Sequence, residues 1–534
     1  MIDIEEVKKA ILFTQTGKYK EAEELYISLL KQNPNESALL SAFGLFYVNT
    51  GNFDKAVEYL KKACEIKETF GTVASFGFAE YERANYKDAA EILEHSLEFG
   101  ENADVYNKLI LSLFEIKSFK KAIEYTEKMC VLYPNDSRTV ANKVKMLTQT
   151  GKLIEAERVC AEYLKEHTQD AVLWYHLGLL KELIYSDDKS AIECYKLAGE
   201  RGNLGADYNI AVAYKKLGEY SEAEKYYTKF LQTMPNDEEG TTALGMLYLE
   251  QKKFREGYEL FYKRKKGKID SRTNNLWEVG TPLNKDLLVI CDQGLGDHIQ
   301  FIRYLPFLQK NHNITVAECK QLRGLFEENY PDIKFIDIDE INPNAQAVRV
   351  TDLAYILGMD FDNIPFSEGY LNSKTADIKN DKLKVGLCWE SGAAGIRGMI
   401  NRTIHVKCFE PFFNLNNIQT YSFQYSDTFK GNEKYPQMIN LAKDFQDFSD
   451  TAKALKAMDV VVTVDTSVAH LAGALGVKTF LLLPYAPDWR WFNSDKETPW
   501  YKSVEIFRQK DHISWEEPIN EIIARLKIES EKSV

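Results

Sequence analysis

The first half of the chain reads as a series of paired amphipathic helices marked by one short recurring pattern. A turn residue is followed two positions later by a residue that is usually aromatic, and three positions after that by a small residue. The small residues are Ala22, Ala56, Ala89, Ala122, Ala156, Ala191, Ala223 and Gly257, so successive copies lie between 32 (Ala191 to Ala223) and 35 (Ala156 to Ala191) residues apart. Self-similarity at such a period is typical of a helical repeat array.

Each part of the pattern has a physical role. The turn residue reverses the chain between two helices, the aromatic residue is expected to fill the gap between them, and the alanine lets their backbones approach closely. Pro34, Pro134 and Pro235 stand twelve residues after the alanine of their copies, where they are expected to end the second helix. The sixth copy, residues 185 to 188, lacks the turn glycine. The pattern resembles the tetratricopeptide repeat over residues 1–265.

A solenoid of such repeats has a long concave face that usually binds an extended peptide or another protein. Alternatively, the repeats pair two copies of the chain or support the domain behind them. Because tetratricopeptide arrays pair in some proteins and not in others, the sequence leaves a homo-oligomer open.

After Arg264 the helical period is lost and short apolar runs alternate with helix-like segments. Residues 266–284 are charged and rich in turn residues, which indicates a connector. Expected strands follow in LLVI, in residues 314–317, 334–338 and 347–350, and in a second series at 384–392, 419–425, 459–465, 478–484 and 503–508. The alternation predicts two α/β domains with parallel sheets, residues 285–375 and 383–510, with a helix and tail in 511–534. Ligands in such sheets bind beyond the carboxyl ends of the strands.

One strand end carries candidate chemistry, in VVVTVDTSVAHLAGALG (460–476). Asp465, Thr466 and Ser467 occupy the predicted turn from strand to helix, where free backbone N–H groups form an anion site that suits a phosphate. His470 lies one turn into the helix and is placed to donate to the same phosphate. The alternative is that Asp465 and Thr466 only cap the helix and His470 packs in the core.

Charge and composition narrow the class of protein. Lysine plus arginine total 67 against 80 aspartate plus glutamate, a net charge of −13, which argues against general binding to nucleic acid or an anionic membrane. The eight cysteines are scattered singly, as expected of reduced core thiols. The N-terminal segment lacks the pattern of a signal peptide and no apolar run is long enough to cross a bilayer, so we expect a cytoplasmic protein.

Four segments together carry a family resemblance: QGLGD (293–297), NRTIHVKCFEPFF (401–413), VDTSVAHLAGALG (464–476) and LLPYAPDWRWF (482–492). Following the repeats, they resemble bacterial tetratricopeptide-repeat glycosyltransferases. Their catalytic half is similar to the heptosyltransferases of lipopolysaccharide synthesis, and the layout is similar to the O-linked N-acetylglucosamine transferases. The resemblance implies a GT-B fold of two Rossmann-like domains, with the N-terminal half facing the acceptor, the C-terminal half holding a nucleotide-sugar, and no metal or other cofactor.

The same resemblance assigns roles to residues. Asp297, with Gly294 and Gly296 in its loop, matches the proposed general base of the heptosyltransferases. Thr466, Ser467 and His470 match the phosphate motif D-T-x-x-x-H, which starts at Asp465, and Arg402 matches a basic residue that reaches the diphosphate. Ser391 with Gly392 and, as a weaker inference, Gln424 end neighbouring strands and are further candidates for nucleotide contact. Asp297 is alternatively an N-cap, His298 competes for the role of base, and Arg402 is alternatively a surface arginine.

Some segments depart from simple motifs. The loop before Asp297 is not G-x-G-x-x-G, so a nicotinamide fingerprint is not supported. Asp337 and Asp339 spell D-x-D in the acceptor half, where we expect a solvated strand end. Residues 393–400, which include Arg397, are interpreted as a mobile loop. Among Trp489, Arg490 and Trp491, we expect contact with the sugar from Arg490 and packing from one tryptophan.

The leading hypothesis is an inverting, metal-independent enzyme that transfers a sugar from a nucleotide-sugar to a protein held by the repeats, such as Ser or Thr of a flagellin-like protein. The first alternative is an interaction protein whose transferase half is inactive. The second is a transferase that acts on a lipid-linked glycan.

Overall fold

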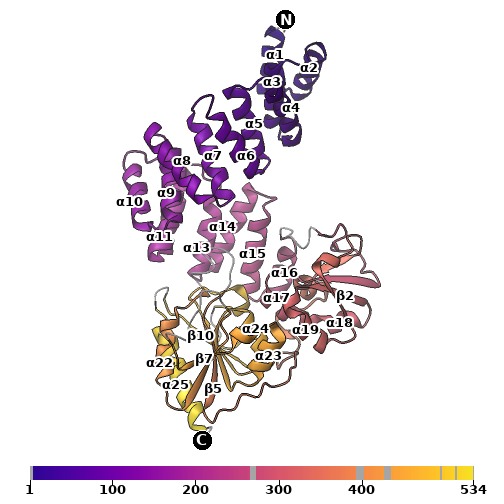
Figure 1. Cartoon of the computed structure of the whole chain (residues 1–534), viewed down its shortest axis with the longest axis vertical. Helices are drawn as coiled ribbons and strands as arrows, with labels where there is room; N and C mark the ends of the chain where they lie inside the picture. Colours follow the sequence, from indigo (N-terminus) through magenta and orange to yellow (C-terminus); the bar gives the residue numbers. More distant parts are fainter. Residues whose placement is uncertain are drawn as a thin grey trace. The chain divides into compact units, whose positions relative to one another are not determined.

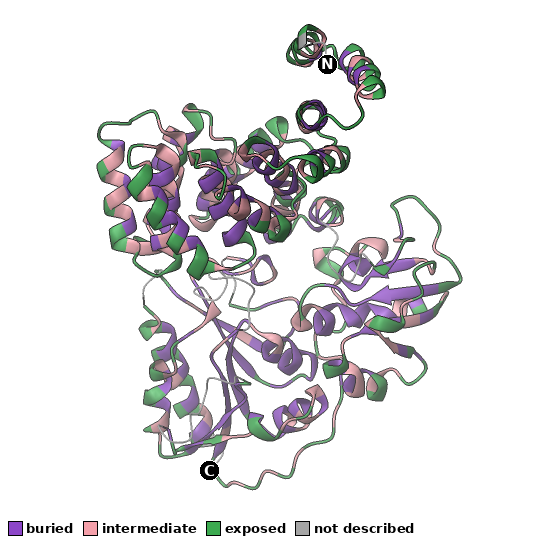
Figure 2. Ribbon diagram, turned by 45° about the horizontal axis from the view of Figure 1, so that its top comes forward, coloured by how far each residue is buried: buried purple, intermediate pink, exposed green. Residues whose placement is uncertain are grey.

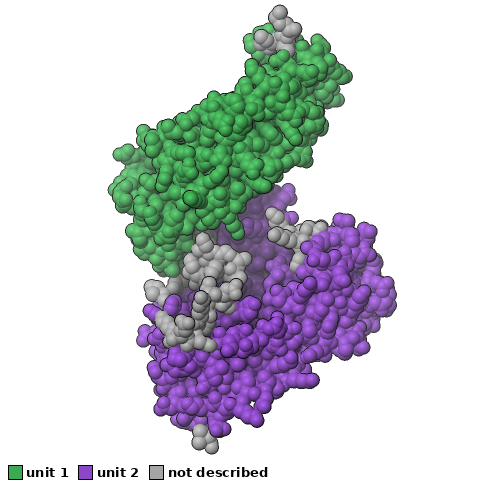
Figure 3. All heavy atoms as spheres, in the orientation of Figure 1, with its two compact units in different colours: residues 1–206 green, residues 207–534 purple. Residues whose placement is uncertain are grey.

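The computed structural model describes residues 4–264, 272–391, 402–425, 435–493, 496–511 and 514–532. The chain falls into two compact units, residues 1–206 and 207–534 (Figure 3). The first unit contains only helices in its described residues, whereas the second contains the last helix pairs of the array and all the described strands. The candidate site lies within the second unit.

The described residues before the connector form sixteen helices in eight antiparallel pairs, as the repeat predicts (Figure 1). The pairs are Ile4–Gln15 (α1) with Tyr19–Gln32 (α2), Ser37–Asn49 (α3) with Phe53–Ile66 (α4), Phe70–Glu82 (α5) with Tyr86–Ser96 (α6), Ala103–Glu115 (α7) with Phe119–Leu132 (α8), Ser137–Gln149 (α9) with Leu153–Leu164 (α10), Ala171–Tyr185 (α11) with Asp188–Glu200 (α12), Ala206–Lys216 (α13) with Tyr220–Thr233 (α14), and Glu238–Glu250 (α15) with Phe254–Phe261 (α16).

The small residue of the pattern is the fourth residue of the second helix in every pair, and each of the seven alanines has no exposed surface. The turn position is left-handed in all eight copies, with φ between 50° and 75°. Glycine adopts this conformation at no steric cost, whereas Ala84, Lys117, Ser186 and Lys252 are strained there. The sixth copy therefore makes the same turn without glycine.

The aromatic residue of the pattern is less uniform than expected. Phe254 is 1% exposed, but Tyr19 and Phe119 at the equivalent position are 49% and 40% exposed. Tyr19 and Phe119 therefore fill the gap only in part, although the ring of Phe119 contacts Phe114 of α7, with centroids 6.2 Å apart.

The first sheet has the strand order β3-β2-β1-β4 and is parallel throughout. Its strands are Asp286–Ile290 (β1), Asn313–Glu318 (β2), Lys334–Asp337 (β3) and Ala347–Arg349 (β4), and its helices are Leu295–Phe301 (α17), Leu305–Gln309 (α18), Lys320–Asn329 (α19) and Leu353–Ile356 (α20). The single helix expected after β1 is interrupted by a 3-10 turn at Ile302–Tyr304, and Pro306 stands in the first turn of α18. The apolar residues Ile299, Ile302, Leu305 and Leu308 of this segment are all buried.

The second sheet has the order β10-β9-β8-β5-β6-β7 and is also parallel. Its strands are Leu383–Cys388 (β5), Ile418–Ser422 (β6), Met438–Asn440 (β7), Val460–Val464 (β8), Thr479–Leu483 (β9) and Val504–Arg508 (β10), with helices Glu410–Phe413 (α22), Phe448–Lys456 (α23), Ser467–Ala474 (α24) and Glu516–Lys532 (α25). Figure 2 shows the strands of both sheets largely buried. The short strand β7 was not predicted, because only one of its three residues, Met438, is buried and the strand carries no apolar run.

The last helix of the array, α16, is built into the core of the α/β region. The ring of Phe254 stacks on Trp500 at 5.8 Å between centroids and on Phe492 at 6.4 Å. Tyr258 and Phe261 contact Trp489, with centroids 6.2 and 6.3 Å apart. These side chains share one apolar cluster with residues of both sheets.

A buried ion cluster follows directly after α16. Arg264, whose side chain is 5% exposed, donates to Asp292 at 2.7 Å and to Asp352 at 2.5 Å. Arg349 donates to the second oxygen of Asp352 at 2.6 Å, and Thr351 donates to Asp292 at 2.9 Å. Because Asp292 lies two residues after β1, this cluster fixes the start of the loop that carries Asp297.

In the expected connector, Leu276 forms a parallel bridge with Ala347 and so extends the first sheet beyond β4. Among the described helices, none combines the length and the apolar character that crossing a bilayer requires.

Candidate functional site

A pocket of about 370 Å³ opens at the carboxyl ends of β5, β6 and β8, which are neighbours in the second sheet. Its lining includes four of the predicted site residues: Ser391, Gln424, Thr466 and Ser467. Leu295 of α17 and Gln321 of α19 also line it, so helices that follow strands of the first sheet contribute as well. Its position agrees with the general rule for ligand sites in parallel sheets.

The N-terminus of α24 forms one wall of this pocket through Thr466, Ser467 and Val468. Thr466 is the N-cap, yet in the described residues its side chain makes no capping bond, and its hydroxyl lies 3.3 Å from that of Thr463. The first N–H groups of the helix are therefore not taken by the cap side chain. A helix start of this kind attracts an anion through its free donors and its dipole.

Gln424 shapes the opposite wall. Its Oε1 atom accepts the backbone N–H groups of Glu390 at 2.8 Å and Trp389 at 3.2 Å, and its side chain is buried. The amide therefore holds the loop after β5, which carries Ser391 into the pocket lining. The expected contact between Gln424 and a nucleotide stays a prediction, since the oxygen is already engaged by the protein.

Asp297 lies in the first turn of α17 and makes two contacts. One oxygen accepts the N–H of Gly294 at 3.0 Å. Gly294 is the N-cap of α17, so Asp297, the third residue of the helix, bonds back to the cap and is not the N-cap considered from the sequence. The other oxygen accepts from the guanidinium of Arg490, which belongs to the loop after β9. His298 points elsewhere: it is buried, its Nδ1 lies 3.8 Å from the sulfur of Cys319, and burial lowers its pKa.

Asp297 begins a row of five alternating charges, which we call the ion chain: Asp297, Arg490, Asp488, Arg402 and Asp465. Arg490 donates to Asp488 at 2.7 Å, and Arg402 lies 3.3 Å from the other oxygen of Asp488 and 3.4 Å from Asp465. Burial alone would raise the pKa of Asp488, but the two guanidiniums outweigh it and lower this pKa. Burial raises the pKa of Asp465, against the opposing effect of Arg402. Arg402 is thus part of a connected site and not an isolated surface arginine.

His470 lies at the inner end of the ion chain. Its Nε2 atom is 3.8 Å from Asp465, its Nδ1 atom is 3.0 Å from the hydroxyl of Tyr501, and its ring stacks on Trp491 at 5.2 Å. Burial, reinforced by the nearby Arg490, lowers the pKa of His470 to about 3. The imidazole is therefore neutral at pH 7 and brings no positive charge to a phosphate.

Gly296 of α17 packs closely against His470 of α24. A Cβ atom at position 296 would lie 2.8 Å from Cδ2 of the histidine, closer than side chains tolerate. The glycine of this loop is thus explained by a close approach, whatever it contributes to a ligand.

The sequence reasoning missed Asp488, although it singled out the three residues that follow. Trp489 and Trp491 are both fully buried, so both pack, whereas Arg490 makes the contact with Asp297. A signal was available in the alternation of acidic and basic residues in APDWRW, but the sequence does not show that Asp488 faces Arg402. The predicted Gly392 and residues 393–400, with Arg397, lie outside the described residues. Elsewhere, the described residues offer no group of three or more His, Cys, Asp or Glu side chains placed to hold a metal.

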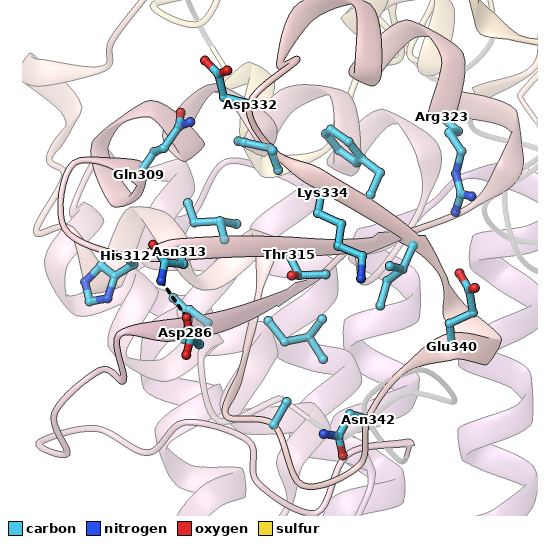
Figure 4. A pocket seen from close by; sticks show the side chains of 17 residues that line it. Asp286, Gln309, His312, Asn313, Thr315, Arg323, Asp332, Lys334, Glu340 and Asn342 are labelled. Atoms are coloured by element: carbon cyan, nitrogen blue, oxygen red, sulfur yellow. Dashed lines mark hydrogen bonds between the residues drawn. The ribbon is translucent and has the colours of Figure 1, made fainter.

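A larger hollow of about 1090 Å³ lies at the first sheet, lined in part by the first residues of β1, β2 and β3 (Figure 4). Its lining mixes charges of both signs, including Asp286, Arg323, Lys334 and Glu340, and Asp286 accepts from Asn313 at 2.7 Å. None of the predicted site residues described by the structure lines this hollow. We therefore take the pocket at the second sheet as the candidate site.

Comparison with known proteins identifies the repeats directly. Residues 13–66 and 208–237 match models of the tetratricopeptide repeat. Protein FlbA of Caulobacter vibrioides is 23% identical over 445 residues, covering 74% of this chain and 73% of FlbA. Because 74% exceeds the share of the chain before the connector, the similarity to FlbA extends into the region of parallel sheets.

Other relatives match over shorter parts. The TPR repeat-containing protein MJ1428 of Methanocaldococcus jannaschii is 25% identical, covering 46% of this chain and 48% of its own. Protein O-mannosyl-transferase TMTC3 of Mus musculus is 23% identical, covering 43% of this chain, which spans only 27% of TMTC3. Among solved structures, a tetratricopeptide repeat protein from Parabacteroides merdae covers 45% of this chain and 96% of its own at 15% identity, with a TM-score of 0.42.

Proposed function

We propose that this chain, a tetratricopeptide-repeat solenoid followed by two parallel sheets, is a glycosyltransferase of the GT-B type that moves a sugar from a nucleotide-sugar to a protein. One observation carries the proposal. The pocket at the carboxyl ends of the second sheet is lined by Leu295 of α17, and the same helix carries the carboxylate Asp297 two residues later. A donor site and an acceptor-side base on facing sheets are the two elements that sugar transfer needs.

The donor is held by the second sheet in this proposal. The N–H groups at Thr466 and Ser467 and the guanidinium of Arg402 bind the diphosphate, because negative charge grows there as the sugar leaves. The nucleoside lies toward the loop that Gln424 braces. His470 takes part as a neutral group that supports the loop of Gly296.

Transfer itself uses Asp297. The carboxylate accepts the proton of an acceptor hydroxyl while that oxygen bonds to the anomeric carbon, and the bond from that carbon to the diphosphate breaks. Attack from the face opposite the leaving group inverts the anomeric configuration. The chain supplies guanidiniums and N–H groups to the leaving group, so the proposal requires no metal.

The acceptor is a protein segment bound by the repeats, for example a Ser- or Thr-containing region of a flagellin-like protein. Two features support this part: tetratricopeptide arrays commonly bind peptides, and TMTC3, a relative over part of this chain, is named as a protein O-mannosyl-transferase. The similarity to FlbA also supports this part, because it extends from the repeats into the region of parallel sheets.

The first test is the melting temperature (Tm) of the full chain with a panel of nucleoside diphosphates and nucleotide-sugars. At 100 times its Kd, a donor should add about 2.7 kcal/mol, or roughly 5 °C in Tm at about 2 °C per kcal/mol. Arg402→Gln, which removes the guanidinium proposed to bind the diphosphate, should lose this shift, while Arg272→Gln, at an exposed ion pair, keeps it. Asp297→Asn should bind the donor but transfer no sugar. Turnover by Asp297→Asn at the parental rate would show that another group is the base.

Asp297 is already paired with Arg490 in the protein, and this ion pair favours one alternative, an interaction protein whose second unit is inactive. That alternative predicts no shift with any nucleotide. A transferase for a lipid-linked glycan instead predicts that residues 207–534 keep acceptor recognition without residues 1–206. The cut belongs at 206 and not at 265, since α16 is part of the α/β core.

A further inference from the structure

Asp488 stands at the centre of the ion chain, and the proposed reaction gives it no role. Each of its carboxylate oxygens faces a different guanidinium: Oδ1 is 2.7 Å from Nη1 of Arg490, and Oδ2 is 3.3 Å from Nη2 of Arg402. Arginines can bind a phosphate group in the same way, with separate guanidiniums donating to separate oxygens of one anion.

The ion chain remains open to solvent, unlike the buried cluster at Arg264. The side chains of Arg402, Asp488 and Arg490 are 35%, 16% and 12% exposed. In the Arg264 cluster, the side chains of Arg264 and Asp352 are 5% and 3% exposed. Exchange of one anion for another is therefore physically accessible at Asp488 and not at the sealed cluster.

The charges of the ion chain also oppose a second anion. Asp297, Asp488 and Asp465 bring three negative charges against the two positive charges of Arg490 and Arg402, a sum of −1 when all are ionised. A diphosphate cannot pair with both arginines while Asp488 occupies them, because the total would become more negative at close range. One carboxylate has to leave its partners.

We propose that Asp488 is an internal anion that holds Arg402 and Arg490 in position until the diphosphate of a nucleotide-sugar replaces it, so that Asp488 sets the affinity for the donor. The inference rests on the proposed function and deepens it. Asp488 is a positioning residue in this scheme, since it acts through the two arginines. Asp465, with a single guanidinium contact, and Asp297, with a helix-capping contact, are less suited to the exchange.

The substitution Asp488→Asn removes the negative charge of the side chain and keeps its size and shape. Oδ1 of Asp488 also accepts the N–H of Arg490 at 3.2 Å and so caps the 3-10 turn Trp489–Trp491. Asparagine is as good an N-cap as aspartate, so the turn is retained while the anion is removed. Asp339→Asn is the matched control, because Asp339 is an exposed aspartate paired with Arg272 on the surface.

The test is isothermal titration of the full chain with inorganic pyrophosphate. Asp488→Asn should bind pyrophosphate at least tenfold more tightly than the parent, and Asp339→Asn should bind like the parent. Adding Arg402→Gln to Asp488→Asn should abolish the gain. Equal or weaker binding by Asp488→Asn, or no binding by either protein, overturns the proposal.

A measurement on the parent covers the case in which Asp488→Asn does not fold. A crystal structure with pyrophosphate should show phosphate oxygens between Arg402 and Arg490 and the side chain of Asp488 turned away. Pyrophosphate bound while Asp488 keeps both contacts overturns the proposal. If the protein transfers sugar but Asp488→Asn binds pyrophosphate with the parental affinity, this inference is refuted and the proposed function stands. If Asp488→Asn binds pyrophosphate more tightly but neither protein transfers sugar, the transferase is refuted and the inference about Asp488 stands.

Discussion

Replacing Arg264 by methionine should destabilise the second unit strongly. The substitution keeps most of the apolar stem but leaves two buried carboxylates, Asp292 and Asp352, without the guanidinium that lies 2.7 and 2.5 Å from them. Removing one partner of a buried ion pair costs about 3–5 kcal/mol. For a unit of the size of residues 207–534, this corresponds to a fall in Tm of roughly 6–10 °C at about 2 °C per kcal/mol.

The stability lost in Arg264→Met should depend on pH, and the direction of this dependence follows from the pKa of Asp292. Burial alone would raise the pKa of Asp292, but Arg264 outweighs it, so the pKa is lowered in the folded protein. The paired carboxylate therefore contributes stability above its unfolded pKa of about 3.9, which is lost as the pH falls through the lower folded value. Without Arg264, the largest effect that opposes burial is lost, Thr351 and Arg349 remain, and the folded pKa rises. The penalty in Arg264→Met should then be largest near pH 8 and shrink toward pH 5.

Tryptophan fluorescence during heating is a suitable assay. Six of the seven tryptophans lie in residues 207–534, the exception being Trp174, so the signal reports mainly on the second unit. Adding Asp292→Asn to Arg264→Met should restore part of the Tm, and Arg272→Met, at an exposed ion pair, should leave it at the parental value. A deficit in Arg264→Met below about 1 kcal/mol, or one that does not change with pH, would refute the reasoning.

Three further substitutions test the packing around the site. Gly296→Ala should destabilise by about 1–3 kcal/mol and weaken the nucleotide shift, because its Cβ would lie 2.8 Å from His470; Gly71→Ala, with open space around it, should not. Phe254→Ala should cost about 3–5 kcal/mol, whereas Phe119→Ala, at the equivalent but 40% exposed position, should cost far less. In the parent, the pKa of His470 is lowered from 6.5 to about 3 on folding, so acidification from pH 7 to 5 should reduce the free energy of unfolding by about 2 kcal/mol. His470→Gln should lack this part of the loss.

Each of these three has a result that contradicts it. An unchanged Tm in Gly296→Ala would mean that the loop and His470 separate without cost. Equal losses in Phe254→Ala and Phe119→Ala would mean that α16 is no more buried than α8. Parallel Tm profiles of parent and His470→Gln from pH 7 to 5 would mean that the pKa of His470 is the same in the folded and the unfolded protein.

The repeats could be predicted in detail because their pattern is local. The turn, the small residue and the helix boundaries lie within six residues of one another, and each copy repeats the evidence. The strands were found for a similar reason, since runs such as VVVTV are apolar throughout. Among the described strands, β7 was missed, because only one of its three residues is buried and it carries no apolar run.

The candidate site was predictable only in its strand-end residues. Thr466, Ser467, Ser391 and Gln424 share a pocket because parallel strands end at one edge, which a sequence can indicate. The ion chain was not predictable, since Arg490 and Asp297 are 193 residues apart and their meeting depends on how the two sheets face each other.

The fusion of α16 with the α/β core sets where such a protein can change in length during evolution. Gain or loss of a whole repeat within residues 1–206 leaves the contacts of Phe254 and Arg264 intact, so the array can adapt to longer or shorter partners at little cost to the rest. The same event at Glu238–Phe261 would remove part of the core itself. Among related chains, repeat number should therefore vary at the N-terminal end, while the final pair stays in register with the sheets.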